Sequence, residues 1–422
     1  MTAPVMRPGW LVRPQTKKLF DVLGEPNLRA VGGCVRDSLR SQATDTEQQN
    51  VDIDMATPLV PETVMAQLTQ AGVKVVPTGL KYGTVTAILD GFHYEITTLR
   101  QDVATDGRHA RVAYGEDWCV DAGRRDFTVN ALYCDAGGCV HDPLGTGLAD
   151  LQAGRVVFIG DAGTRIREDY LRVFRFFRFH ALMGEGTPDE TALAACQAAA
   201  REGAGLEKLS GERLQQEILK ILAMPNPAST LEIMQKTGVL AYALPLDEVR
   251  TGLSRLRGLA GFDAAVEQLD PIVRLSAVMA HKPDQAERVM RHLRLSNRDR
   301  DRIETLLSGP YRDVIVTQDN LVQLAYRLGV QVCLDRLLLQ TSAETAPDLK
   351  ALRTAIAGLG RLTLPVFPVS GKTLLAAGFE AGPDMGRLLS ALEDWWVDNG
   401  FKGDEPALLA RLNEMVDSAD TD

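Results

Sequence analysis

The sequence predicts an α+β protein, in which an N-terminal head of mixed β-sheet and helices is followed by an all-α neck, body and tail. In the first 150 residues, short apolar runs alternate with glycine-containing turns, as in strands joined by tight connections. From Thr164 onward, apolar residues recur at helical spacing in segments bounded by Gly, Pro or capping residues. We therefore expect a head over residues 1–150, a helical neck over 151–235, and a helical body and tail over 236–422.

The head is expected to contain six strands and two helical stretches. The strand-like runs cover residues 28–33, 51–56, 82–89, 92–99, 127–135 and 155–160. Residues 35–40 form the start of one helical pattern, and residues 61–72 form a second. The Asp90-Gly91 pair between two alternating runs is a strong hairpin signal. Residues 101–123 are polar and have little periodicity, which predicts a mobile loop.

The helical segments after the head are short and show no internal repeat. The clearest of them cover residues 168–183, 190–203, 211–224, 229–244 and 300–309. Residues 404–422 end in an acidic tail that we expect to be frayed.

Composition is that of a soluble globular protein of two to four domains, with 422 residues and a net charge of −10. No apolar run is long enough to cross a bilayer, and the N-terminus lacks the order of a signal peptide. The six cysteines form no C-x-x-C pair, which argues against a disulfide framework and a structural zinc site. A cytoplasmic location is therefore expected. The pI of about 5.3 counts against non-specific binding to nucleic acid.

Two acids in a strand-like run form the first candidate site. Asp52 and Asp54 lie two residues apart, so both carboxylates project from the same face of a strand. Neighbouring carboxylates repel each other unless a cation lies between them, and Mg²⁺ prefers such oxygen ligands. Glu95, in the adjacent hairpin strand, can bring a third carboxylate to this face. The alternative is a pair of solvated acids at a strand end.

A second candidate feature is the Gly32-Gly33 turn between an apolar strand and a helix. Glycines here allow a ligand to approach the backbone closely, while the helix N-terminus offers free N–H groups to an anion. Arg36, in the first helical turn, can add a charge-assisted contact to a phosphate. Arg125 and Asp126 belong to a further basic cluster that follows residues 101–123. Each of these signals is weak alone.

The series Asp169, Arg172, Arg175 and Arg178 is more specific. A spacing of three on a helix predicts a continuous stripe of one acid and three guanidinium groups. An acid beside an arginine offers an acceptor and a donor, which match the base edges of cytosine and adenine but not those of uracil and guanine. The alternative is an amphipathic helix with a polar surface. We expect both to hold, with Phe174, Phe176, Phe177 and Phe179 on the buried side.

Taken together and in order, these segments resemble the class II tRNA nucleotidyltransferases (CCA-adding enzymes) and the bacterial poly(A) polymerases. The matching strings are VGGCVRD (31–37), VDIDMATP (51–58), RRDFTVNAL (124–132), DPLGTGLADL (142–151), REDYLRVFRFFRF (167–179) and GERLQQEILKIL (211–222). They cover roughly residues 28–235, and HLRLSNRDRDRIETLL (292–307) resembles the family's body more loosely. Six motifs in the right order make the resemblance highly specific.

The resemblance implies a role for each candidate residue. Asp52 and Asp54 would hold catalytic Mg²⁺, with Glu95 at the position of a third catalytic carboxylate. The nucleotide-binding residues would be Gly32, Gly33, Arg36, Arg125, Asp126, Asp169, Arg172, Arg175 and Arg178. Among them, Asp169 and Arg172 would form the template for the incoming base, and Arg125 and Asp126 would lie at its sugar and phosphate. The motif with Glu212, Arg213 and Glu217 is expected to brace a helix.

The implied activity is addition of CCA from CTP and ATP to the 3′ end of tRNA, without a nucleic-acid template. The string TGLKYGTVTAIL (78–89) resembles the CCA-adding type, and the acidic C-terminus differs from the basic extension common in poly(A) polymerases. Arg108, His109 and Arg111 in the predicted loop favour full CCA addition. Poly(A) synthesis, partial CC or A addition, and a non-catalytic RNA-binding protein on the same scaffold are the alternatives. No membrane association and no protein partner are indicated.

The distribution of charge is uneven. Residues 404–422 contribute −5, whereas residues 155–178 and 287–302 each contain six arginines and three acids. The two arginine-rich segments predict local binding of nucleotide and of one shaped RNA.

Overall fold

The computed structural model confirms the predicted α+β fold class. It describes residues 4–44, 52–106, 109–183, 186–260, 270–280, 283–309, 314–317, 319–341 and 349–419. The described chain forms two compact units. The first contains residues 1–247 and 287–295, and the second contains residues 248–286 and 296–422. The predicted division at residues 150 and 235 stays a prediction.

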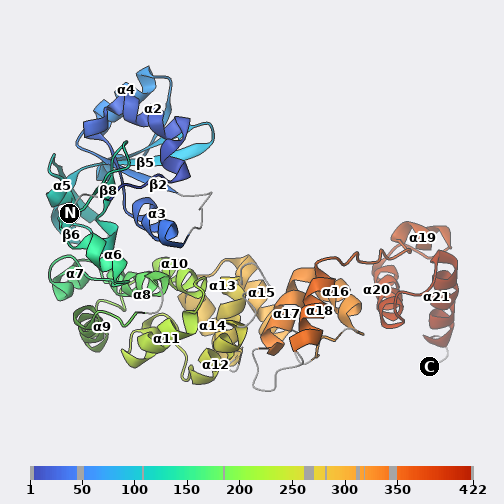
Figure 1. Cartoon of the computed structure of the whole chain (residues 1–422). Coiled ribbons are helices and arrows are strands. Elements are labelled where there is room, and N and C mark those ends of the chain that lie inside the picture. The colour runs from blue at the N-terminus through green and yellow to red at the C-terminus, as the bar shows by residue number, and fades with distance from the viewer. Residues whose placement is uncertain are drawn as a thin grey trace. The chain divides into compact units, whose positions relative to one another are not determined.

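A seven-stranded mixed sheet organises the N-terminal part of the first unit (Figure 1). Its strands, in spatial order, are β3 (Lys74–Gly79), β4 (Thr84–Leu89), β5 (Phe92–Thr98), β2 (Ile53–Thr57), β1 (Arg29–Val31), β8 (Tyr133–Cys134) and β9 (Val140–His141). Strand β2 is central: it pairs antiparallel with β1 and parallel with β5. The predicted β4–β5 hairpin is confirmed, and both turn residues, Asp90 and Gly91, have the positive φ angles that a type I′ turn requires.

Helices pack against the sheet and form the head's main core. They are α1 (Gly9–Val12), α2 (Pro14–Leu23), α3 (Gly33–Thr44) and α4 (Pro61–Gln70), with the single turns η1 (Glu25–Asn27) and η2 (Leu80–Tyr82) between elements. Ile53 and Met55 of β2 and Tyr94 and Ile96 of β5 are buried in this core. Since side chains alternate along a strand, the residues between them face away from the core. Asp54 of β2 and Glu95 of β5 are therefore on the opposite face.

The prediction of a loop over residues 101–123 is wrong. This segment, together with Arg100, forms a separate two-stranded sheet of β6 (Arg100–Asp106) and β7 (His109–Tyr114), followed by α5 (Trp118–Gly123). The pairing register shifts between Asp102 and Ala104, which breaks the alternation that marks a regular strand. The side chains of Arg108, His109 and Arg111 lie outside the described part of the chain.

Two other predicted strands are largely absent as strands. In residues 127–135, only Tyr133–Cys134 (β8) is extended in the sheet, and Thr128–Asn130 form a 3₁₀ turn (η3). Residues 155–160 make a single bridge, between Phe158 and Phe127. Both runs are apolar because their side chains are buried, not because they belong to a sheet. In contrast, β3 was missed because it contains Pro77, which is tolerated only at a sheet edge.

The neck region of the first unit is helical. Its helices are α6 (Gly147–Gln152), α7 (Ala162–Glu168), α8 (Leu171–Met183), α9 (Glu190–Glu202), α10 (Gly211–Leu222) and α11 (Pro227–Lys236), followed by η4 (Leu240–Tyr242). The predicted helix over 229–244 is interrupted because Gly238 takes a positive φ of 78°. Helix α8 packs against α10. The four phenylalanines of α8 are buried, as predicted.

The second unit is built from helices, apart from connecting segments, within the residues that are described. They are α12 (Arg250–Ala260), α13 (Pro271–Met279), α14 (Pro283–His292, shared at residue 286 with the first unit), α15 (Asn297–Ser308), α16 (Leu321–Leu328), α17 (Val330–Thr341), α18 (Leu349–Leu359), α19 (Gly371–Ala376), α20 (Pro383–Asp398) and α21 (Glu405–Ala419). Arg302 joins three of them through bonds to Asp270 and to the buried Asp335. A separate apolar cluster around Trp396 holds α19, α20 and α21 together.

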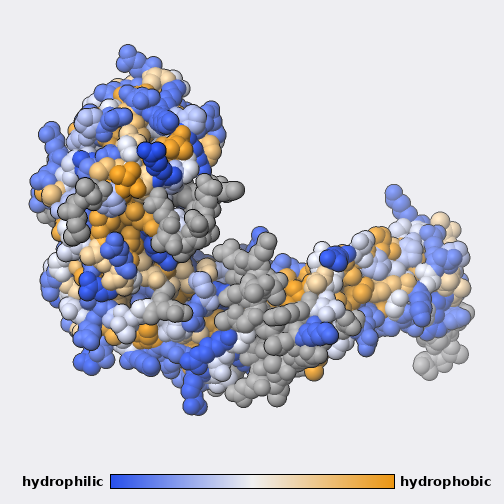
Figure 2. Space-filling model, viewed as in Figure 1, coloured by the Kyte–Doolittle hydropathy of each residue, from blue (hydrophilic) through white to orange (hydrophobic). Residues whose placement is uncertain are grey.

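Hydrophilic side chains cover much of the visible surface, with apolar residues scattered among them (Figure 2). In the described ranges, none of the helices combines the length and apolar character needed to span a bilayer.

Candidate active site

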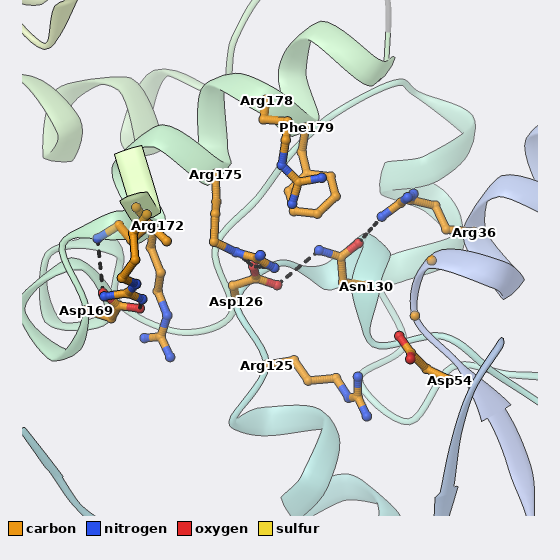
Figure 3. A pocket seen from close by; sticks show the side chains of 14 residues that line it. Arg36, Asp54, Arg125, Asp126, Asn130, Asp169, Arg172, Arg175, Arg178 and Phe179 are labelled. Atoms are coloured by element: carbon orange, nitrogen blue, oxygen red, sulfur yellow. Dashed lines mark hydrogen bonds and ion pairs between the residues drawn. The ribbon is translucent and has the colours of Figure 1, made fainter. Parts of the chain in front are cut away.

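A polar cavity of about 490 Å³ lies within the first unit, between the head sheet and helix α8 (Figure 3). Its wall is formed by Gly32, Gly33, Arg36, Asp54, Arg125, Asp126, Asn130, Asp169, Leu171, Arg172, Arg175, Arg178, Phe179 and Arg213. This size falls within the range of about 300–1,000 Å³ that is usual for small-molecule sites. All nine predicted nucleotide-binding residues line the cavity, together with Asp54.

One side of the cavity is acidic. Asp54 and Glu95 are direct neighbours in the parallel pairing of β2 with β5, so their side chains share a face. Burial raises the pKa of Asp54 to about 6; repulsion from Glu95 and Asp52 adds to the rise, and Arg125 opposes it. Asp52 lies just before β2 rather than in it. Asp54 is thus close enough to both Glu95 and Asp52 to be repelled by them, and it is the one of the three that is part of the cavity wall.

This acidic group fits a divalent cation in its donor chemistry. Carboxylate oxygens are the ligands that Mg²⁺ and similar hard cations take in proteins. A cation near Asp54 would also relieve the repulsion that raises the pKa of its carboxyl group. The chain therefore has a group of residues suited to a divalent metal next to the cavity.

The Gly-Gly turn places a helix N-terminus at the cavity. Gly32 has a φ of 75°, which favours glycine, and α3 begins at Gly33. Arg36 lies in the first turn of α3 and is buried. Its guanidinium group donates to both carboxylate oxygens of Asp37, at 2.8 and 2.7 Å, and to Asn130 at 2.5 Å.

Arg125 is held in place by two polar groups. It donates to Asp121 at 3.0 Å and to the Tyr133 hydroxyl at 3.2 Å. The Tyr133 hydroxyl in turn donates to Asp121 at 2.7 Å. Burial would raise the pKa of Asp121, but the guanidinium groups of Arg125 and Arg124 hold it below the usual range. The arginine is therefore oriented before any ligand binds. Its side chain lies on the same side of the cavity as Asp54 (Figure 3).

Asp126 occupies the middle of the cavity wall. It accepts from Arg175 Nε at 2.7 Å and from the Asn130 amide at 3.0 Å. Burial alone would raise the pKa of Asp126, but Arg175 and Asn130 lower it, so the carboxylate stays ionised. Asn130 accepts from Arg36 with its other side-chain atom. The chain of bonds from Arg175 to Arg36 crosses the centre of the view in Figure 3.

The predicted stripe on α8 is only partly correct. Helix α8 begins at Leu171, so Asp169 lies before it in an extended conformation. Its carboxylate accepts two bonds from Arg213, at 2.7 and 3.1 Å. Arg172 donates instead to Glu168 and to the Arg165 carbonyl. Asp169 and Arg172 are nevertheless close together at the side of the cavity opposite Asp54 (Figure 3).

The two remaining arginines of α8 share an acid on α10. Arg178 Nε donates to Glu217 at 2.6 Å, and Arg175 Nη1 lies 3.9 Å from the same carboxylate. Glu217 is 5% exposed. The expected role of Glu217 as a brace between helices agrees with these contacts. Both guanidinium groups also lie over the Phe179 ring. Arg175 is 5.3 Å from the centre of the ring, and Arg178 is 4.1 Å from it.

Sequence reasoning missed Asn130, Leu171, Phe179 and Arg213 as members of the cavity wall. Asn130 and Arg213 are inside two of the matching strings. The resemblance therefore covered their positions, but an asparagine and an arginine at these places did not by themselves indicate a binding site. Arg213 was expected only to brace a helix, whereas it lines the cavity and pairs with Asp169. The wall contains six arginines and three aspartates, and so it is cationic overall.

Comparison with known proteins agrees with this arrangement. Family models match in three places: the poly(A) polymerase head domain at residues 28–157, the probable RNA- and SrmB-binding site of polymerase A at 187–247, and tRNA nucleotidyltransferase domain 2 at 267–412. The mitochondrial CCA tRNA nucleotidyltransferase 1 of Danio rerio is 31% identical over 410 residues, covering 92% of this chain and 87% of the relative. The CCA-adding enzyme of Lactococcus lactis is 30% identical, covering 95% and 97%.

A solved structure matches over almost the whole length. The CCA-adding enzyme of Bacillus stearothermophilus, in complex with CTP, superposes with a TM-score of 0.78 at 25% identity, covering 97% of this chain and 100% of the other. The sequence matches and the shared architecture lead to one conclusion: this chain belongs to the tRNA nucleotidyltransferase and poly(A) polymerase family, among relatives that are CCA-adding enzymes.

Proposed function

We propose that this protein adds CCA to the 3′ end of tRNA, using CTP and ATP in a metal-dependent nucleotidyl transfer. The observation that carries the proposal is the single cavity that joins Asp54 of the head sheet to Asp169 and Arg172 at the start of α8. One wall thus carries a carboxylate suited to a metal and arginines suited to a triphosphate. It also carries an acid–arginine pair suited to a base edge. The relatives named CCA-adding enzymes support the same activity.

The base would be read by Asp169 and Arg172. A carboxylate accepts from the exocyclic amino group of cytosine or adenine, and a guanidinium donates to the neighbouring ring nitrogen. In the free protein these two side chains are bonded to Arg213 and Glu168. A carboxylate accepts several hydrogen bonds and a guanidinium has five N–H donors, so both side chains could contact a base edge while keeping these partners.

The triphosphate would be bound by backbone N–H groups and arginines. The start of α3 at Gly33 offers free N–H groups to an anion, next to Arg36. Arg125, Arg175 and Arg178 line the same cavity. Asp126, fixed by Arg175 and Asn130, is placed to accept a hydrogen bond from a ribose hydroxyl.

Asp52 and Asp54 would hold Mg²⁺, with Glu95 as the third carboxylate. Mg²⁺ bound there supplies Lewis-acid stabilisation of the charge that develops on the reacting phosphate and on pyrophosphate. The raised pKa of Asp54 supports this assignment, because the carboxylate is poorly compensated without a cation. The six cysteines carry no disulfide bond, which supports the cytoplasm as the compartment.

The experiment is an incorporation assay with three RNAs. Transcripts of tRNA ending in the discriminator base, tRNA transcripts ending in CC, and an unrelated RNA are each incubated with one NTP at a time and with CTP plus ATP. We expect two C residues and one A on the first RNA, one A on the second, and none on the third. Long A tracts, or addition to the unrelated RNA, would instead favour poly(A) synthesis.

The metal assignment is tested with Asp54→Ala and Asp52→Ala. Each should abolish incorporation while the fold and tRNA binding are retained, because neither carboxylate is part of an apolar core. Glu202→Ala, an exposed acid at the end of α9, is the matched control. Near-normal turnover by a folded Asp54→Ala protein would refute the assignment.

A further inference from the structure

A second cluster of metal-ligating side chains lies in the β8–β9 hairpin, away from the cavity wall. Asp135, Cys139 and His141 place a carboxylate oxygen, a thiol sulfur and an imidazole nitrogen within 4.8 Å of one another. In the described residues, no other group of three or more His, Cys, Asp or Glu side chains brings its ligand atoms within 4.8 Å of one another. None of the three lines the candidate active site.

From this geometry we infer that Asp135, Cys139 and His141 form a binding site for a thiophilic divalent cation, with Zn²⁺ as the best fit. Zinc takes sulfur, nitrogen and oxygen ligands in a tetrahedron, and three protein ligands leave one position for water. Mg²⁺ is disfavoured because it demands six oxygen ligands in an octahedron. The site is therefore different in chemistry from the carboxylates at Asp54.

The hairpin holds the three ligands close to the geometry that the metal needs. The Asp135 carboxylate and His141 Nε2 are 2.7 Å apart. Tetrahedral ligands at about 2.0–2.1 Å from zinc are about 3.3 Å apart, so this pair would open by only about 0.6 Å. The thiol, within 4.8 Å of both, would move inward by rotation about its own bonds. All three side chains are partly exposed, which gives an ion access.

The backbone of the hairpin loop is fixed from two sides. Within the loop, Asp135 N–H donates to the Cys139 carbonyl at 3.2 Å, and Cys139 N–H donates to the Asp135 carboxylate at 2.9 Å. The N-terminal segment also binds the loop, since Met6 N–H donates to the Gly138 carbonyl at 2.9 Å. Gly138 has a φ of 84°, and a Cβ there would lie 2.1 Å from the Met6 carbonyl oxygen. The ligands are thus held on a preorganised loop.

Charge around the cluster adds to its selectivity. Arg29 interacts electrostatically with both Asp135 and Cys139, and its guanidinium group stacks over Trp118 at 4.2 Å. A nearby positive charge opposes every cation, so a metal must form strong bonds to bind. A thiolate and a carboxylate together neutralise Zn²⁺, and the thiolate–zinc bond is strong enough to compete.

The other cysteines are poor alternatives. The thiols of Cys34, Cys134, Cys196 and Cys333 are buried, and none of them belongs to the cluster. Cys119 is exposed, but it is not in the cluster. Cys119 therefore provides a matched control for Cys139 in the same unit.

The test is a cobalt titration of the full-length, tag-free chain after chelator treatment. Co²⁺ takes the ligands of zinc and shows a thiolate-to-cobalt charge-transfer band in the near ultraviolet. Excess Mg²⁺ occupies carboxylate sites without absorbing. We expect the band to saturate at one equivalent of Co²⁺ and to disappear when Zn²⁺ is added. Cys139→Ser should abolish the band, and Cys119→Ser should leave it unchanged.

Further variants keep the test decisive. His141→Asn and Asp135→Asn should each weaken Co²⁺ binding at least tenfold, and either replaces Cys139→Ser if that variant does not fold. No thiolate band in the wild-type protein would overturn the proposal. So would a band that persists in folded Cys139→Ser, or one that disappears in Cys119→Ser. Because the readout is spectroscopic, it does not depend on whether the protein adds nucleotides.

Discussion

Replacing Asp169 by alanine should change which bases the protein accepts more than how tightly it binds triphosphate. Asp169 is the acceptor proposed for the amino group of cytosine and adenine, and it now accepts two bonds from Arg213. In Asp169→Ala the acceptor is lost, whereas the arginines of the cavity wall remain. Arg213 is released as an additional cation, which should sustain the affinity for the triphosphate.

The magnitude follows from the base-edge contact that Asp169 and Arg172 would make together. A good bidentate contact contributes about 1–3 kcal/mol of discrimination between bases. At about 1.4 kcal/mol per factor of ten, this equals a factor of about 5 to 140. The side chains of Asp169 and Arg213 are 21% and 27% exposed, so their ion pair is partly screened. Losing that pair should therefore cost less stability than a fully buried pair would.

The assay compares kcat/KM for CTP and UTP on a tRNA transcript ending in the discriminator base. We expect the CTP to UTP ratio to fall at least fivefold in Asp169→Ala, with a smaller change in the KM for the triphosphate. Glu202→Ala again serves as the control and should keep the wild-type ratio. A folded Asp169→Ala protein with unchanged base choice would refute the base-reading role of this carboxylate.

Two more predictions concern ionisation and the buried acid of α10. The pKa of Asp54 is about 6, above the ordinary 3.8, so its ionisation destabilises the metal-free fold as pH rises from about 4 to about 6. A cation binds the ionised form, so apparent Mg²⁺ affinity should fall as pH drops through 6, as measured by Mg²⁺-dependent shifts in Tm; a flat profile from pH 5 to 8 would contradict this. Glu217→Ala leaves the guanidinium of Arg178 without its carboxylate and should cost about 3–5 kcal/mol, or about 6–20 °C in Tm. Glu217→Gln keeps an acceptor and should lose less, so equal losses would argue against the ion pair as the cause.

Local patterns predicted the parts of the site that depend on a few neighbouring residues. The D-x-D spacing in a strand-like run predicted the position of Asp54, and the pairing of β2 with β5 brings Glu95 beside it. The Gly-Gly turn before a helix predicted the start of α3. Alternation and helical spacing are short-range properties, so they can be recognised without knowing which distant segment packs alongside.

Long-range pairing could not be predicted in the same way. The hairpin of β6 and β7 was missed because a register shift hides its alternation. The partner of Asp169 was expected to be a neighbour on the same helix, but it is Arg213 on α10. The cluster of Asp135, Cys139 and His141 depends on the turn that folds β9 back on β8. In each case the missing information is which distant segment packs alongside.

The same limit changes the interpretation of the arginine-rich segments. Each of the six arginines in residues 155–178 has an acidic partner within 4.0 Å, and for Arg155, Arg175 and Arg178 that acid lies outside the segment. In residues 287–302, Arg302 is committed to Asp270 and Asp335. A local charge of +3 counted along the sequence is therefore not a free positive surface.

The ion pairs of the cavity wall bear on how the proposed triphosphate site would work in an acidic protein. Each cavity arginine keeps its guanidinium group oriented by a carboxylate, so little side-chain entropy is lost when a phosphate arrives. The wall has six arginines and three aspartates, so a triphosphate that contacts several of these guanidinium groups at once would meet a net positive charge. One phosphate contacting one surface pair gains little, because that arginine is already neutralised and screened. The proposed site would therefore favour a triphosphate that contacts several of these arginines at once over an RNA backbone that contacts one.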